Sequence, residues 1–118
     1  MADEKKAEIA YKVMTAEQWN RLQTNGFFSG APVDIHDGYI HLSTAEQLRG
    51  TVDKHFEGQV GLILLEVKLA AVGNHIRWEP SRGGALFPHL YGGLPMAAVG
   101  RHWVLDADRN GKVLLPKL

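Results

Sequence analysis

Two short segments of the sequence carry side chains that could perform acid–base or anion-binding chemistry. The first segment is Asp37-Gly-Tyr-Ile-His-Leu-Ser43. If it forms a strand, Tyr39, His41 and Ser43 share one face, because alternate side chains of a strand point to opposite faces. These three residues would directly precede a helix N-terminus, where free backbone N–H groups attract anions such as phosphates. The alternative is that Ser43 only caps the helix and His41 is a half-buried structural residue.

The second segment is Arg77-Trp-Glu-Pro-Ser-Arg82 together with Phe87-Pro-His-Leu-Tyr91. Aromatic and polar side chains that converge from irregular backbone are typical of the wall of a small-ligand pocket. The candidates here are Trp78, Glu79, Arg82, His89 and Tyr91. The aromatic side chains are better explained as core residues. For His89 and Glu79 both interpretations stay open, since Glu79 could simply form a solvated ion pair worth ~0–1 kcal/mol.

Several other kinds of site are excluded or disfavoured by the sequence. There is no cysteine, which rules out disulfides, thiolate nucleophiles and thiolate zinc sites in this chain. Phosphate-binding loops, dinucleotide fingerprints and zinc-protease motifs are also missing. The six histidines include no pair at the helical spacing of a zinc helix. We therefore predict no metal site.

Composition limits the class of protein further. The chain has 118 residues, enough for one domain, and its 13 basic and 13 acidic residues give no net charge. Strong nucleic-acid binding or a polybasic membrane anchor is therefore not indicated. The longest apolar run, residues 60–65, is too short for a membrane span. With no cysteine and no signal-peptide pattern, the sequence favours a cytoplasmic protein.

The first half of the chain predicts two strands and two helices after a loose leader at residues 1–7. A strand at 9–14 precedes a helix at 16–25, which begins with the capping box Thr15-Ala-Glu-Gln18. Residues 27–37 predict a loop, and 39–43 a short strand. Ser43-Thr-Ala-Glu46 predicts a second capping box and a helix to about residue 57. Gly50, inside that helix, indicates close packing at that point.

The second half predicts mostly strands, which makes the domain α+β. Residues 60–67 are nearly all apolar, as in the central strand of a sheet. A short strand is expected at 72–78, and the glycines and prolines of 80–95 indicate a long irregular loop of functional use. A hairpin of 97–106 and 112–115 closes the domain.

The two segments also resemble a family of uncharacterised bacterial proteins, domain-of-unknown-function family 952. Ile40-His-Leu-Ser43 and Phe87-Pro-His-Leu-Tyr-Gly92 are the most specific of the shared motifs, and the resemblance extends over roughly residues 10–115. This family is associated with the ADP-ribosyltransferase-like fold, in which a split β-sheet clamps NAD. The order Tyr11, Trp19, Gly26 and then His41-Leu-Ser43 is similar to that of RNA 2′-phosphotransferases of that fold.

The resemblance implies a cleft that binds a nucleotide-like ligand, with NAD as a substrate. Where those transferases have the histidine that orients the NAD ribose, this chain has Lys12. In this hypothesis His41 positions a ribose hydroxyl, Glu79 stabilises developing positive charge, and His89 completes the catalytic set. The ligand-binding residues are expected to be Lys12, Tyr39, Ser43, Trp78, Arg82 and Tyr91. His41 and the glycine-rich segment should face each other across a hollow that accepts a dinucleotide.

Two alternatives belong to other classes. The replacement of the expected histidine by Lys12 favours an interaction module that kept the fold and lost the chemistry. A metal-dependent hydrolase that uses His36, His41 and His89 is the weaker alternative, because their spacing matches no established ligand motif.

Overall fold

The first of two three-stranded antiparallel sheets contains the most apolar strand of the chain. The computed structural model describes residues 8–118, so the predicted leader at residues 1–7 lies outside the described residues. The sheet has the order β1 (Ile9–Thr15), β4 (Leu62–Lys68), β8 (Val99–Leu105). β4 is buried on both faces except at its last residue. The prediction of a central strand is therefore confirmed.

The second sheet has the order β3 (Ile40–His41), β6 (Leu86–Leu90), β5 (Ile76–Pro80). The two sheets are linked at one point, where Tyr11 of β1 and Ser43 exchange backbone hydrogen bonds of 2.8 and 2.9 Å. A two-stranded sheet of β2 (Phe27–Phe28) and β7 (Leu94–Pro95) completes the strands of the described residues. The result is a single α+β domain.

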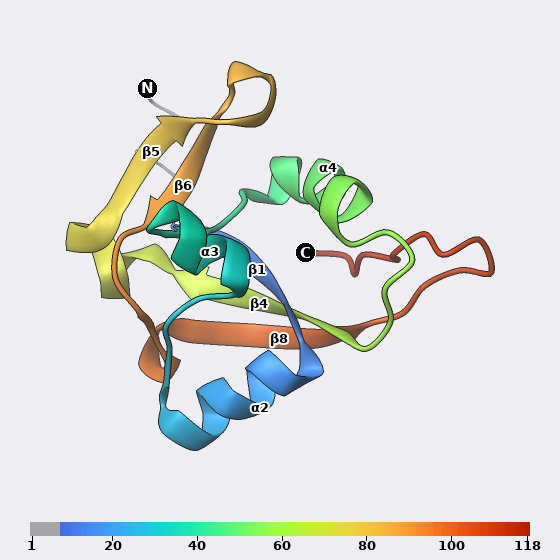
Figure 1. Cartoon of the computed structure of the whole chain (residues 1–118), viewed down its shortest axis with the longest axis horizontal. Coiled ribbons are helices and arrows are strands. Elements are labelled where there is room, and N and C mark those ends of the chain that lie inside the picture. The colour runs from blue at the N-terminus through green and yellow to red at the C-terminus, as the bar shows by residue number, and fades with distance from the viewer. Residues whose placement is uncertain (1–7) are drawn as a thin grey trace.

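Three α-helices and three short 3₁₀ segments connect the strands of the described residues. α2 (Ala16–Asn25) and α4 (Ala45–His55) lie on opposite sides of the first sheet, with the short helix α3 (Pro32–Asp37) near the second (Figure 1). The 3₁₀ segments are η1 (Leu69–His75), η2 (Arg82–Gly84) and η3 (Met96–Ala98). No helix among residues 8–118 is long and apolar enough to cross a membrane.

The helices bury two separate apolar clusters against the two faces of the first sheet. Trp19 and Leu22 of α2 belong to the cluster that also holds Ile40, Leu42 and Leu90 of the second sheet region. On the other face, Leu48 and Val52 of α4 pack with apolar side chains of β1 and β4. Ile40 and Leu42 thus face the core, as the sequence pattern predicts, and the opposite face of β3 is left for polar side chains.

The second helix begins one residue later than predicted. Thr44, not Ser43, is the N-cap: its hydroxyl accepts from the Gln47 N–H, and the Gln47 side chain accepts from the Thr44 N–H. Ser43 is unavailable as a cap because its backbone N–H and carbonyl are both engaged with Tyr11. For α2, by contrast, the capping box of Thr15 and Gln18 is confirmed.

Four predictions of irregular or extended structure were wrong in detail. The expected loop at 27–37 contains β2 and α3, and the expected loop at 80–95 contains β6 and β7. Pro88 fits in β6 because its carbonyl faces β3 and accepts from Leu42, so the missing N–H removes no bond to β5. Residues 69–75 form η1 before β5 starts, and the expected final hairpin is reduced to one bridge between Ala107 and Val113.

Candidate functional site

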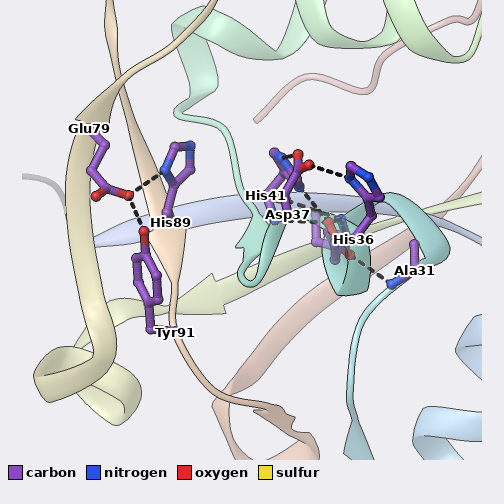
Figure 2. Close-up of polar contacts among 9 residues, drawn as sticks. Ala31, His36, Asp37, His41, Glu79, His89 and Tyr91 are labelled. Atoms are coloured by element: carbon purple, nitrogen blue, oxygen red, sulfur yellow. Dashed lines mark hydrogen bonds and ion pairs between the residues drawn. The ribbon is translucent and has the colours of Figure 1, made fainter.

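Histidine and carboxylate side chains gather on the outer face of the second sheet, opposite its apolar face (Figure 2). His41 on β3 pairs with His89 on β6, and Arg77 on β5 is the other neighbour of His89. The rings of the two histidines lie 5.7 Å apart between centroids, edge to face. The site therefore consists of two histidine clusters that share one sheet.

The His41 cluster uses both nitrogens of the imidazole ring. His41 Nδ1 lies 2.6 Å from Asp34 Oδ1, and Nε2 lies 2.9 Å from Asp37 Oδ2. Ionised carboxylates only accept hydrogen bonds, so the ring nitrogen that bonds Asp34 must be the donor, and Asp37 lies within ion-pair distance of the other nitrogen. Asp37 also accepts from His36, at 3.1 Å. Hydrogen bonding to His36, and then the charge of His41, lowers the pKa of Asp37 against the opposing effect of its partial desolvation.

A buried ion pair supports His41 from below. Lys12 Nζ lies 3.0 Å from Asp34 Oδ2 and donates to the His41 carbonyl at 3.2 Å. Asp34 also accepts from the backbone N–H of Ala31 at 2.7 Å and of His41 at 3.1 Å. Burial lowers the pKa of Lys12, although the Asp34 carboxylate opposes this effect. With three oxygen acceptors around Nζ, we assign the ammonium form to Lys12.

Asp34 is the most strongly perturbed acid of the site. Its burial alone would raise the pKa, but the hydrogen bond from His41, the charge of Lys12 and the two backbone N–H groups outweigh that effect. The pKa is held at about 2, below its ordinary value of 3.8. Asp34 therefore joins β1, α3 and β3 as an acceptor that is ionised at neutral pH.

The His89 cluster leaves one ring nitrogen free. His89 Nδ1 lies 2.8 Å from Glu79 Oε1, and the same oxygen accepts from the Tyr91 hydroxyl at 2.7 Å. These two hydrogen bonds lower the pKa of Glu79, and the bond to Glu79 raises the pKa of Tyr91. His89 Nε2 has no hydrogen-bond partner within residues 8–118, yet no buried side-chain nitrogen or oxygen there is left unsatisfied. Among the described residues Nε2 is therefore the ring nitrogen of His89 with no hydrogen bond, in a side chain that is only 3% exposed.

Tyr39 connects the two clusters. Its ring stacks on His89 with centroids 4.0 Å apart and an interplanar angle of 21°. The ring also contacts His41 at 4.7 Å and Tyr91 at 5.2 Å, both in tilted geometry. Tyr39 thus covers the imidazole of His89 and fixes its plane.

A hollow of about 280 Å³ adjoins Tyr39 on the side of α3. Its lining includes Ile35, Gly38, Tyr39 and Gly92. Pockets that enclose small ligands occupy roughly 300–1,000 Å³. The hollow can accept one ring of a nucleotide, and the rest of a dinucleotide would lie on the open surface. The sequence hypothesis expected His41 and the glycine-rich segment to face each other across a hollow that accepts a dinucleotide. In the structure the lining of this smaller hollow includes Gly92 but not His41, whose ring lies 5.7 Å from that of His89 between centroids.

The structure brings together five of the residues proposed from the sequence and separates the other four. Tyr39, His41, Glu79, His89 and Tyr91 form the site. Lys12 lies beneath the site, and its ammonium group forms an ion pair with Asp34.

The other three candidates point elsewhere. The hydroxyl of Ser43 is buried and hydrogen-bonded to Thr51 at 2.8 Å. Trp78 packs against the apolar core because it alternates with Glu79 on β5. Arg82 lies over Phe87 at the start of β6, beside α4.

Sequence reasoning missed Asp34 and Asp37, which hold the imidazole of His41. Asp34 is 22 residues from Lys12 and 7 from His41, so no local spacing indicates their contact. The available signal was Pro32 with Gly38, a helix-opening proline and a left-handed glycine that bound α3. Within the described residues, no group of three or more histidine and acidic side chains is arranged to hold a metal ion.

The fold and the paired histidine clusters define a small α+β domain with a polar site on one sheet. The chain belongs to the family described as "Protein of unknown function (DUF952)", whose model matches residues 13–102. It is similar to the crystal structure of protein CC0527 from Caulobacter crescentus, with 42% identity and a TM-score of 0.86 over 90% of this chain and 93% of that chain. The solution structure of CC0527 gives 44% identity and a TM-score of 0.78 over 87% and 89%. No curated protein matches the chain.

Proposed function

We propose that this domain binds a nucleotide that contains ADP-ribose, such as NAD, where its two sheets meet, and acts on the ribose. The observation that carries the proposal is the His89–Glu79 pair, in which Glu79 orients the ring and leaves Nε2 free. A histidine oriented by a carboxylate through one nitrogen is equipped to exchange a proton through the other. The link between the sheets at Tyr11 and Ser43 supports a split-sheet fold of the ADP-ribosyltransferase type.

In this proposal His89 makes the ribose contact that the sequence hypothesis gave to His41. His41 has both ring nitrogens occupied by carboxylates, so it acts as a positioning residue. When nicotinamide leaves with the electron pair of its glycosidic bond, positive charge develops on the ribose. The second oxygen of Glu79 takes no hydrogen bond from the described residues and is free to stabilise that charge. His89 Nε2 accepts the proton of the acceptor hydroxyl that forms the new bond.

The second candidate function is a ligand-binding module without catalysis. Two observations favour it: the ammonium group of Lys12 is used up in the ion pair with Asp34, and the hollow beside Tyr39 holds only about 280 Å³. Such a module would bind ADP-ribose and leave NAD intact. The two functions therefore share the site and differ only in turnover.

Ligand-observed NMR and calorimetry with NAD, ADP-ribose and a 2′-phosphorylated RNA oligonucleotide test the proposal. Two variants form a matched pair. His89→Asn keeps a nitrogen at the position of Nδ1, whereas His89→Gln places one near Nε2. We expect His89→Asn to weaken ADP-ribose binding by about tenfold, the equivalent of one good hydrogen bond, and His89→Gln to retain more of it.

Each outcome of that experiment decides something. Absence of binding by all three ligands at millimolar concentration would remove the proposal. Binding with no release of nicotinamide from NAD would favour the non-catalytic module. Equal binding by the two His89 variants would show that Nε2 makes no contact with the ligand.

A further inference from the structure

The hydroxyl of Tyr91 and the imidazole of His89 bind the same carboxylate oxygen (Figure 2). Tyr91 donates to Glu79 Oε1 at 2.7 Å, and His89 Nδ1 lies 2.8 Å from that oxygen. Hydrogen bonds from His89 and then from Tyr91 lower the pKa of Glu79, so the carboxylate is ionised at neutral pH and only accepts. Nδ1 must therefore be the donor, and a neutral ring then has its lone pair on Nε2.

Tyr91 stays a hydrogen-bond donor at neutral pH. The hydrogen bond to Glu79 raises the pKa of Tyr91 above its ordinary value of 10.0, so the hydroxyl keeps its hydrogen. The guanidinium carbon of Arg77 lies 5.0 Å from the centre of the Tyr91 ring, and Arg77 pairs with His89 across β5 and β6. Arg77 thus contacts the ring that carries the hydroxyl and places a permanent positive charge beside His89.

The charge on the imidazole of His89 depends on the ionisable groups that face it. These are Glu79 and Arg77 on β5, His41 on β3, Tyr39 just before β3, and Tyr91 just after β6. The Glu79 carboxylate favours the imidazolium, whereas Arg77 disfavours a second positive charge, and His41 has a carboxylate beside each ring nitrogen. A second hydrogen bond to the carboxylate makes it a weaker partner for an imidazolium, because its negative charge is shared between two donors.

We propose that Tyr91 is a positioning residue that acts through Glu79 and keeps His89 neutral, with Nε2 able to accept a proton. This inference rests on the proposed function, in which Nε2 takes the proton of the acceptor hydroxyl. Without the Tyr91 hydroxyl, the full charge of Glu79 stabilises the imidazolium. Nε2 then already carries the hydrogen that it has to accept during the reaction.

A titration of the imidazole rings by ¹⁵N NMR, without ligand, measures this effect, and the signals of His89 are assigned by their loss in His89→Gln. Tyr91→Phe keeps the ring and removes the hydroxyl, and we expect the midpoint of the His89 titration to rise by about half a pH unit. Arg77→Gln should raise it by less, since Arg77 is exposed and its charge is screened. Tyr39→Phe is the matched control: it removes a hydroxyl from the same aromatic cluster, but one that makes no hydrogen bond to Glu79 within residues 8–118.

The inference is overturned if Tyr91→Phe leaves the midpoint unchanged or lowers it, because the hydroxyl then has no effect on the charge of His89 or only holds Glu79 in place. An equal rise in Tyr39→Phe would also overturn it. A rise in Tyr91→Phe alone, in a chain that fails to bind ADP-ribose, would uphold the role of Tyr91 and contradict the proposed function. Where NAD is cleaved, the acid limb of the pH–rate profile should move to higher pH in Tyr91→Phe by the same amount, and a profile that stays in place would contradict the role in the reaction.

Discussion

His41 and His89 are paired residues on neighbouring strands, but their surroundings differ in a way that assigns them different work. His41 has a carboxylate on each ring nitrogen, a third of its side chain exposed, and a buried lysine–aspartate pair beneath it. His89 is almost fully buried, has one carboxylate, and makes no hydrogen bond through Nε2 within residues 8–118. The imidazole with a carboxylate beside each ring nitrogen is engaged on both sides, and the imidazole with a carboxylate beside only one nitrogen is the one that can meet a ligand.

The exposed fraction of a histidine side chain therefore does not tell whether one of its ring nitrogens can bind a ligand. The more exposed histidine has no nitrogen to offer, whereas the more buried one presents a single atom in a fixed direction. Glu79 fixes that direction through Nδ1, and Tyr39 fixes the plane of the ring by stacking. Substitutions on the His41 side should therefore change mainly stability, and substitutions on the His89 side should change mainly binding.

The largest effect is expected from Asp34→Asn. The change leaves the ammonium of Lys12 buried without a counter-charge, and breaking a buried ion pair on one side typically costs about 3–5 kcal/mol. Chemical denaturation followed by circular dichroism measures the free energy of unfolding. The double variant Lys12→Met with Asp34→Asn removes the unpaired charge and should recover part of the loss. A single variant as stable as the parent chain would show that the His41 cluster does not hold the fold.

Acid should weaken the same cluster in the parent chain. The pKa of Asp34 is about 2 in the folded protein, against an ordinary value of 3.8. Because the folded pKa is the lower one, the contribution of Asp34 is complete above pH 4 and is lost as the pH falls toward 2. A difference of nearly two pH units corresponds to about 2 kcal/mol. Denaturation curves at pH 5, 4, 3 and 2 measure it, and Asp34→Asn should lose less stability over this range than the parent chain does.

The sequence predicts much of the framework because its signals are local. The capping box at Thr15 is reproduced in α2, the apolar run of β4 is the centre of a sheet, and Gly50 does accept a close neighbour. Alternation correctly turns Ile40 and Leu42 to the core and leaves Tyr39 and His41 on the other face. In each case the residues that decide the outcome are close together in the chain.

The contacts that define the site join residues far apart in the chain, and no pattern in the sequence predicts which of these residues meet. α3 has only six residues, too few for a periodicity to be read. The role of Asp34 depends on Lys12 and His41 from two other elements, and a buried charge becomes favourable only once its partners are in place. Lys12 was expected in the ligand cleft because it stands where the resembling transferases have the histidine that orients the NAD ribose, and no local spacing indicates its pairing with Asp34.

Tyr39 gives the smallest effect and the most direct test of the contrast, since it touches both histidines. Tyr39→Leu removes the stack on His89 and the tilted contact with His41, and aromatic pairs of this kind contribute roughly 0.5–1.5 kcal/mol beyond their buried area. We expect a loss of about 1 kcal/mol in the free energy of unfolding. Tyr39→Phe keeps the ring and should behave like the parent chain, because no hydrogen bond of the Tyr39 hydroxyl is found within residues 8–118.

If Tyr39 serves the His89 side, the leucine variant should also weaken ADP-ribose binding, because the plane of the imidazole is no longer fixed. A variant that loses stability while binding the ligand as tightly as Tyr39→Phe would mean that Glu79 alone orients His89, and that the stack belongs to the structural side of the site.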